Sequence, residues 1–166
     1  MCIRDRDLPK PGSNGIIGDR AIGSTASHAS KLGRACLKGL WLSGVGGVIK
    51  HIPGHGRAPS DSHHRVPRVR AGVGELNEDI EPFVNLCDAK MAMTAHVIFD
   101  AWDTENCASV SPKIIKCQIR EQIGFDGLLL SDDIYMGALS GDISQRAVKV
   151  LHAGCDIALC CESNMS

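Results

Sequence analysis

The chain has 166 residues and a formal net charge of −1 when its histidines are neutral. That length is enough for one hydrophobic core, and 43% hydrophobic and 22% charged residues are the proportions of an ordinary globular domain. A charge so close to zero gives no broad field that would attract nucleic acid or an anionic membrane, and an aromatic content of 4% leaves few rings on which bases could stack. We therefore expect neither nucleic acid nor a membrane as a partner.

The N-terminal sequence and the cysteines do not indicate a secreted protein. The first residues lack the apolar stretch of a signal peptide, and no apolar run is long enough to span a membrane. The eight cysteines include no Cys-x-x-Cys pair, so we expect reduced thiols in a cytoplasmic protein rather than a zinc site or disulfides. The first six residues resemble a translated sequencing adapter. We therefore predict that residues 1–6 are a non-native leader and that residues 7–166 form a single domain.

The hydrophobic pattern predicts helices and strands that alternate along the chain. Leu32, Cys36 and Leu40 recur at helical spacing, so a helix is expected over residues 26–43. A long loop is expected over residues 53–74, where Pro, Gly and Ser are frequent, and a loop of that length is uncommon unless it is functional or disordered. In chain order, the other expected elements are a strand over 45–49, a helix over 75–87 bent at Pro82, a strand over 90–97, a helix from Ser111 and Pro112 to Gly124, a strand over 128–130, a helix over 143–154 and a strand over 157–160.

This order of elements predicts an α/β fold with a parallel sheet. The strands are continuous apolar runs rather than alternating ones, which is typical of strands that are covered on both faces. At least three of them place polar or reactive residues at their carboxyl ends, where a (β/α)8 barrel builds its active site. Because four strands are too few to close such a barrel, which takes about 250 residues, the chain is expected to be either a small open sheet or part of a barrel.

Candidate functional residues gather at the end of the first strand and in the loop that follows it. Buried charge is costly unless it is paired, so a packed core would not select such residues. Asp61 lies two residues before His63, and a carboxylate beside an imidazole orients the ring and raises its pKa, which suits a general acid/base near neutral pH. Lys50 and His51 could donate hydrogen bonds to the hydroxyl groups of a ligand. A polar surface loop and a salt bridge at the sheet edge remain the alternatives for these residues.

Asp132 follows the apolar strand over residues 128–130. A carboxylate at that end of a barrel strand can attack or stabilise an electrophilic carbon, whereas a carboxylate that caps the next helix is the structural alternative. A second chemical alternative is a metal-dependent hydrolase, because imidazole and carboxylate groups suit zinc or iron. Its expected ligands are His51, His55, Asp61 and His63, with His64 beside them. The Pro53–Gly54 turn makes this interpretation the less favoured one, because the first two histidines cannot share one face of a helix.

Several motifs occur in the order found in a known enzyme family. They are Lys50-His51-Ile52-Pro53-Gly54-His55-Gly56, Asp61-Ser62-His63, Met93-Thr94-Ala95-His96, Gly124-Phe125-Asp126-Gly127 and Ser131-Asp132-Asp133, with Arg20-Ala21-Ile22-Gly23 upstream and Ala153-Gly154-Cys155-Asp156 downstream. Across nearly all of residues 15–162 the chain resembles the bacterial β-N-acetylhexosaminidases of glycoside hydrolase family three. The resemblance implies a TIM-type (β/α)8 barrel of which the chain holds about four βα units, a small carbohydrate substrate, retention of anomeric configuration and no metal or organic cofactor.

The same resemblance gives the candidate residues their roles. Asp132 matches the catalytic nucleophile, His63 matches the general acid/base, and Asp61 matches the partner that orients His63. The positions that match sugar-binding residues are Arg20, Lys50 and His51. The resemblance also implies a cytoplasmic enzyme, monomeric when complete, that removes terminal non-reducing N-acetylglucosamine from muropeptides containing anhydro-N-acetylmuramic acid. The early barrel strands of the family are missing, so we expect a central fragment, and a sugar-binding module without activity is the non-enzymatic alternative.

Overall fold

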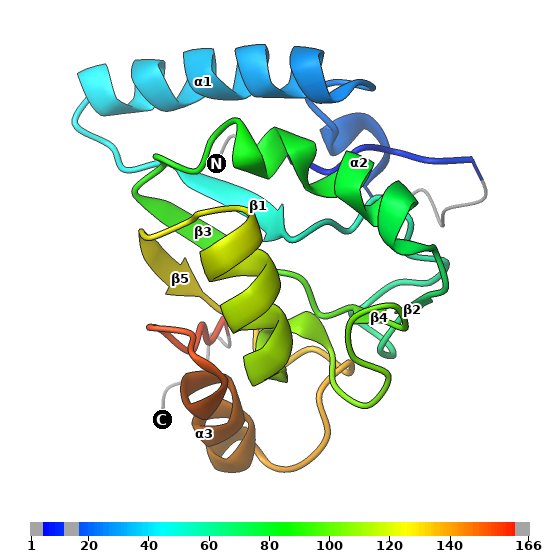
Figure 1. The fold of residues 1–166 in the computed structure, drawn as a ribbon. Helices are drawn as coiled ribbons and strands as arrows, with labels where there is room; N and C mark the ends of the chain where they lie inside the picture. The colour runs from blue at the N-terminus through cyan, green and yellow to red at the C-terminus, as the bar shows by residue number, and fades with distance from the viewer. Residues whose placement is uncertain (1–4, 12–16, 162–166) are drawn as a thin grey trace.

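Three parallel strands form the centre of the computed structural model, which describes residues 5–11 and 17–161 (Figure 1). They are β1 (Val48–Ile52), β3 (Met91–Thr94) and β5 (Leu128–Leu130), and they pair in the order β1-β3-β5. A separate parallel pair consists of β2 (Arg68–Val69) and β4 (Ile98–Phe99). The helices are α1 (Ala26–Leu42), α2 (Val73–Val84), the π-helix η3 (Ile114–Gln122) and α3 (Ile143–Ala153), with short 3-10 helices η1 (Gly18–Arg20) and η2 (Ala108–Val110).

One face of the central sheet is buried. Ile49, Ala92 and Leu129 lie side by side in the strand register, and all three are fully buried. The next residue along each strand points to the opposite face and is only half-buried, as the two-residue period of a strand requires. In Figure 1, α2 and the yellow-green η3 lie over the buried face. The sequence predicted strands covered on both faces, whereas the described residues cover only one.

All four predicted helices form, and several of their ends follow local capping chemistry. Thr25 caps α1 by accepting a hydrogen bond from the N–H of His28, and Asp142 caps α3 in the same way from Gln145. Gly154 ends α3 in the left-handed conformation that favours glycine (φ 112°). The helix predicted from Ser111 also begins there, because the Ser111 hydroxyl accepts from the N–H of Ile114, but it continues as a π-helix.

The apolar stripe predicted for the first helix is not its buried side. α1 lies against α2, and its buried residues are Ala29 and Gly33, the latter beside Leu86. Leu32 and Leu40, which belong to the predicted stripe, are 38% and 37% exposed. The prediction of a helix is thus confirmed, although the apolar stripe from which it was inferred is partly exposed in the described part of the chain.

Three predicted strands differ from the observed structure, and one of them, predicted over residues 90–97, is the shorter β3, which ends at Thr94. The first strand begins at Val48 and continues to Ile52, so Lys50 and His51 lie within β1 rather than after it. The strand predicted over residues 157–160 is reduced to an isolated parallel bridge between Leu130 and Ile157. The ladder stops there because the N–H of Leu159 donates to the side-chain hydroxyl of Ser131 instead of to a backbone carbonyl. The segment still lies along β5, and it therefore helps to fix the chain that follows that strand.

Most of the predicted leader lies outside the described residues, since residues 1–4 are not described. Asp5 and Arg6 are described and buried, and the N–H of Asp5 donates to the carbonyl of Arg20 at 2.8 Å. The origin of residues 1–6 stays a prediction. In the described part of the chain, no helix combines the length and the apolar character needed to cross a membrane.

Candidate active site

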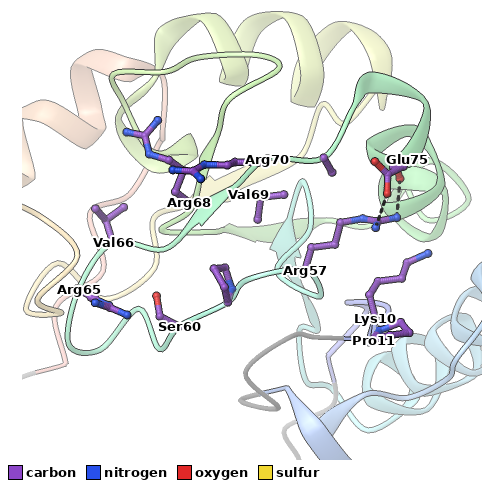
Figure 2. A pocket seen from close by; sticks show the side chains of 12 residues that line it. Lys10, Pro11, Arg57, Ser60, Arg65, Val66, Arg68, Val69, Arg70 and Glu75 are labelled. Carbon is purple, nitrogen blue, oxygen red and sulfur yellow. Dashed lines mark hydrogen bonds and ion pairs between the residues drawn. The ribbon is translucent and has the colours of Figure 1, made fainter.

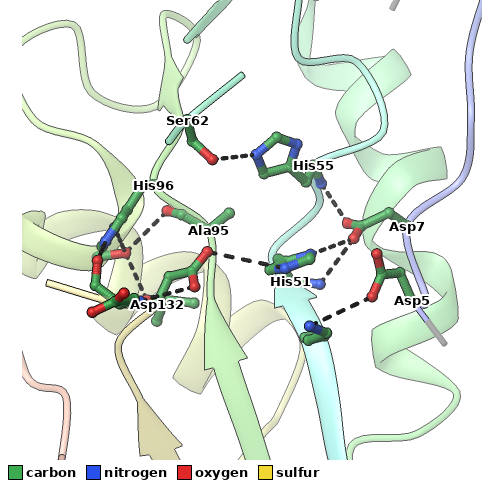
Figure 3. A network of polar contacts seen from close by, with 12 residues as sticks. Asp5, Asp7, His51, His55, Ser62, Ala95, His96 and Asp132 are labelled. Carbon is green, nitrogen blue, oxygen red and sulfur yellow. Dashed lines mark hydrogen bonds and ion pairs between the residues drawn. The ribbon is translucent and has the colours of Figure 1, made fainter. Parts of the chain in front are cut away.

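A small pocket opens at the edge of the central sheet where β1 and β5 end. Parallel strands bring these ends to one edge of the sheet, and Figure 3 shows the polar side chains that gather there. The pocket has a volume of about 180 Å³. Its lining residues are Ile17, Arg20, Lys50, His51, His55, Ser62, His63, Asp132 and Met136. Cationic, imidazole and carboxylate groups therefore face one confined space.

Asp132 presents its carboxylate to this pocket from the end of β5. Its Oδ1 atom accepts a hydrogen bond from the N–H of Asp133 at 2.9 Å, and its Oδ2 atom lies 4.0 Å from Nε2 of His51. The side chain is 14% exposed. Neither Asp132 nor Asp133 caps the following helix. Asp142 caps α3, and the Asp133 side chain accepts a hydrogen bond from the N–H of Tyr135 in a turn. Asp132 is thus held by the backbone on one side and left open to the pocket on the other.

Asp7 and His51 form a buried pair beside Asp132. Nδ1 of His51 lies 2.7 Å from Oδ2 of Asp7, which also accepts the backbone N–H of His51 at 3.0 Å. Burial alone lowers the pKa of His51, but attraction to Asp7, Asp132 and Asp5 outweighs burial and raises it. Burial alone raises the pKa of Asp7, and attraction to His51 together with these hydrogen bonds lowers it. The pair therefore favours an imidazolium that points its Nε2–H toward Asp132.

Asp61 and His63 form a second pair, on the loop between β1 and β2. Oδ1 of Asp61 accepts the backbone N–H of His63 at 2.8 Å and lies 2.7 Å from its Nδ1 atom. Slight burial raises the pKa of Asp61, but the hydrogen bonds and the charge of His63 outweigh it and lower the pKa. With Nδ1–H donated to Asp61, Nε2 is the ring nitrogen left to exchange a proton, and the side chain is 59% exposed.

Two basic side chains line the pocket beside these pairs. The Nη2 atom of Arg20 lies 2.7 Å from Asp5, and Nζ of Lys50 lies 3.8 Å from the same carboxylate. Nε of Arg20 is buried and has no hydrogen-bond partner among the described residues. A buried donor without a partner is costly, so this guanidinium is suited to an oxygen atom of a ligand. Asp5 belongs to the predicted leader, and the roles proposed below do not involve it.

The pocket gathers five of the six site residues predicted from the sequence. The sixth, Asp61, reaches it through its hydrogen bond to His63. The chemical roles of all six stay predictions. Sequence reasoning missed Asp7, because an aspartate next to the predicted leader carries no motif that would connect it with His51. It also missed Ser62, whose hydroxyl lies 3.2 Å from Nε2 of His55.

The metal cluster predicted as an alternative is not assembled. Among the described residues, the one group of three potential ligands whose atoms lie within 4.8 Å of one another consists of Asp5, Asp7 and His51. His55 is absent from it because its backbone N–H, and not its ring, faces Asp7. Asp61 and His63 bond to each other instead. The predicted ligand set of His51, His55, Asp61 and His63 is therefore wrong.

A larger pocket of about 690 Å³ lies along the chain on either side of β2 (Figure 2). Several arginines line it, but carboxylates neutralise most of their charge. Arg57 contacts Asp79 and Glu75, and Arg68 contacts Asp100. Its lining joins no nucleophile to an acid/base pair, so the smaller pocket is the candidate active site.

Comparison with known proteins identifies the family to which the chain is related. Residues 7–166 match the family described as the glycosyl hydrolase family 3 N terminal domain. A β-hexosaminidase of Bordetella pertussis is 38% identical over 162 residues, which are 93% of this chain and 45% of that protein. A β-hexosaminidase of Methylococcus capsulatus is 36% identical and is matched over 47% of its length. The chain thus spans about half the length of these curated relatives.

Solved structures show the same relationship. A family 3 β-N-acetylglucosaminidase from Paenibacillus sp. str. FPU-7 superposes with a TM-score of 0.85 at 32% identity, over 94% of this chain and 31% of that one. NagZ from Neisseria gonorrhoeae, in complex with N-trifluoroacetyl-D-glucosamine, gives a TM-score of 0.81 at 34% identity, over 94% of this chain and 46% of that one. The predicted partial TIM-type barrel is thereby confirmed. The chain belongs to glycoside hydrolase family 3, as part of its N-terminal domain.

Proposed function

We propose that the protein containing this chain is a retaining exo-β-N-acetylglucosaminidase. The observation that carries the proposal is the single pocket lined by Asp132 and by His63, with Asp61 bonded to the imidazole. A retaining glycosidase needs a nucleophile and a separate group that first gives and then takes a proton. The volume of about 180 Å³ is smaller than the roughly 300–1,000 Å³ of pockets for drug-sized ligands, which favours one terminal sugar ring.

In the first step the Asp132 carboxylate attacks the anomeric carbon. The bond from that carbon to the glycosidic oxygen breaks, and Nε2–H of His63 gives its proton to the departing oxygen. The product is a glycosyl ester of Asp132 and a free alcohol. Asp61 holds the imidazole in the required orientation by accepting its Nδ1–H.

In the second step a water molecule replaces the carboxylate. Nε2 of His63, now neutral, takes a proton from the water as its oxygen attacks the anomeric carbon, and the ester bond to Asp132 breaks. Two inversions restore the original configuration. The 59% exposure of the His63 side chain supports this role, because the same nitrogen must meet both the aglycone oxygen and solvent water.

Arg20, Lys50 and His51 are proposed to hold the sugar. All three line the pocket and can donate hydrogen bonds to hydroxyl or acetamido oxygens. The imidazolium of His51 has its Nδ1 bonded to Asp7, so only Nε2–H is left for the ligand or for Asp132. The unpartnered Nε of Arg20 supports the same assignment.

We further propose that the substrate is a muropeptide. Terminal N-acetylglucosamine would be removed from anhydro-N-acetylmuramic acid in the cytoplasm, by a monomer that needs no cofactor. The β-hexosaminidase names of the relatives and the N-trifluoroacetyl-D-glucosamine bound to NagZ support a 2-acetamido sugar. The muropeptide itself rests on the family resemblance.

The test uses the complete open reading frame recovered from the DNA that flanks this sequence. The enzyme is incubated with a 5-fluoro-N-acetylglucosaminyl fluoride, which slows the second step, and peptides are then analysed by mass spectrometry. We expect one labelled peptide with the sugar on Asp132. Asp132→Asn should lose both label and turnover of an aryl N-acetyl-β-glucosaminide, whereas Asp126→Asn, in the exposed turn before β5, should keep both.

His63→Ala should lower turnover by about 10²- to 10⁴-fold, the usual contribution of a general acid. Release of N-acetylglucosamine from purified muropeptides, followed by chromatography, tests the substrate. A label on another residue would refute the mechanism. Binding of N-acetylglucosamine without turnover by the complete wild-type protein would instead favour a sugar-binding module.

A further inference from the structure

His96 is a buried histidine at the edge of the proposed active site, and none of the roles above uses it. It follows β3 and has no exposed surface. Its Nε2 atom lies 3.1 Å from the carbonyl oxygen of Asp133, and its Nδ1 atom lies 2.7 Å from the hydroxyl of Ser109. Figure 3 shows the ring beside Asp132. The ring thus joins the end of β3 to the chain that follows β5.

The partners of the ring determine where its proton lies. A carbonyl oxygen can only accept, so Nε2 must carry a hydrogen and donate it to Asp133. Burial lowers the pKa of His96 and outweighs the attraction to Asp132, which would raise it, so the neutral ring is favoured. In the neutral ring with a hydrogen on Nε2, Nδ1 is an acceptor. The single hydroxyl proton of Ser109 has two acceptors within reach, Nδ1 of His96 at 2.7 Å and the carbonyl oxygen of Ala95 at 3.1 Å, and the shorter contact directs it to the ring. The hydroxyl of Thr94, at 2.6 Å, then donates to Ser109. This orders a chain of hydrogen bonds from Thr94 to the Asp133 carbonyl.

This chain of hydrogen bonds ends at Asp133, the residue whose N–H holds the Asp132 carboxylate. The N–H of Asp133 donates to Oδ1 of Asp132 at 2.9 Å, while its carbonyl accepts from His96 and from the N–H of Met136, each at 3.1 Å. The orientation of the Asp133 backbone therefore decides where its N–H points. A change there moves the hydrogen bond that fixes the Asp132 carboxylate.

We propose that His96 is a positioning residue for Asp132. By donating Nε2–H to the Asp133 carbonyl, it fixes the backbone whose N–H orients the attacking carboxylate. His96 does not touch the sugar or the proton on His63. This inference rests on the proposed function, because it assigns His96 to the step in which Asp132 attacks the anomeric carbon.

The proposed role of His96 predicts different effects for two conservative substitutions. In His96→Gln the amide nitrogen occupies the place of Nε2 and can still donate to Asp133. In His96→Asn the shorter amide can replace only Nδ1, so the bond to Ser109 is kept and the bond to Asp133 is lost. Ser111→Ala is the matched control, since Ser111 is also buried but bonds to Ile114 and Asp103 rather than to this chain of hydrogen bonds.

Each variant of the complete protein is assayed with 4-nitrophenyl and 2,4-dinitrophenyl N-acetyl-β-glucosaminides, and active sites are counted by titration with the fluorinated sugar. His96→Asn should lower kcat/KM per active site by about 10²-fold, the scale of a misplacement of about 1 Å. The loss should be equal for both substrates, because attack by Asp132 is common to them. His96→Gln should stay within about threefold of wild type, because it keeps the donor. Ser111→Ala should lower stability without slowing each active site.

The outcomes separate this inference from the proposed function. If wild type turns over both substrates and His96→Asn matches it per active site, the positioning role is refuted and the proposed function stands. A loss confined to the number of active sites would show a purely structural histidine and would also refute the role. A loss that disappears with the dinitrophenyl substrate would assign His96 to proton transfer instead. Absence of turnover by wild type would overturn the proposed function and this inference with it.

Discussion

Replacing Gly137 by alanine should displace the loop that carries the proposed general acid. Gly137 lies in the turn after β5, and its N–H donates to the carbonyl of His63 at 2.9 Å. A Cβ atom at this position would lie 2.7 Å from the carbonyl oxygen of His64 and 3.0 Å from that of His63. Both contacts are with backbone atoms, which cannot rotate away as a long side chain would.

The required movement can be read from these distances. Ordinary contacts of a Cβ atom begin at 3.4 Å, so the loop must retreat by about 0.7 Å from the site of the new methyl group. Overpacking of this kind costs about 1–3 kcal/mol of stability. Since a misplacement of about 1 Å at a reacting group costs about 10²-fold in rate, we expect kcat/KM to fall by about 10- to 100-fold.

The leaving group shows whether the loss comes from proton donation. A 4-methylumbelliferyl glycoside needs help from His63, whereas 2,4-dinitrophenolate departs without a proton. Gly137→Ala should therefore lose kcat/KM for the first substrate and stay within about threefold of wild type for the second, because general acid catalysis contributes only when the leaving group needs a proton.

Gly39→Ala provides a matched control. No atom lies within 4 Å of a Cβ placed on this exposed glycine of α1, so the variant should gain up to about 1 kcal/mol in helix stability and keep its activity. Urea unfolding measures both changes in stability. Equal losses by Gly137→Ala on the two substrates, or none on either, would refute the argument that the loop of His63 is seated on Gly137.

Two further predictions concern titration. Asp7→Asn removes the strongest attraction that raises the pKa of His51 and leaves the effect of burial, so the pKa of His51 should fall. NMR titration measures this pKa, and an unchanged value would contradict the pairing of Asp7 with His51. The stability that the wild-type imidazolium supplies is present below pH 6.5 and lost as the pH rises through the raised pKa, and the variant should lack this loss. Burial raises the pKa of Cys107 to about 11 and of Cys155 to about 12. Iodoacetamide at pH 8 should therefore label the exposed Cys160 of the folded protein and leave Cys107 and Cys155 unlabelled. Equal labelling of the three cysteines, measured by mass spectrometry, would contradict the burial of Cys107 and Cys155.

The sequence was sufficient wherever local chemistry decides the structure. Ser111 begins a helix and Gly154 ends one, because a hydroxyl can satisfy a free N–H and a glycine can adopt positive φ. The position of Asp132 is predictable because an apolar run ending in a carboxylate places that group at the rim of a parallel sheet. The contact between Asp61 and His63 is predictable because two residues of separation allow a direct hydrogen bond.

Tertiary contacts decided what the sequence could not. Asp7 lies 44 residues from His51, and no local pattern records that distant pairing. The π-helical form of η3 and the early end of the last strand depend on which carbonyl or hydroxyl a given N–H meets in the folded chain. The close contact between the backbone of His63 and Gly137 is likewise a contact between two loops. A glycine in a turn does not indicate in the sequence which segment packs against it.

One face of the central sheet is half-exposed, although the sequence predicts strands that are covered on both faces. Leu128 is 40% exposed although it belongs to a run of three leucines, and such a run is typical of a strand with both faces covered. The chain spans about half the length of its curated relatives, whose family folds as a TIM-type barrel. Closing that barrel would turn this face toward the filled interior. The apolar character of these strands is therefore a property of the whole barrel, which is why activity is best measured on the complete protein.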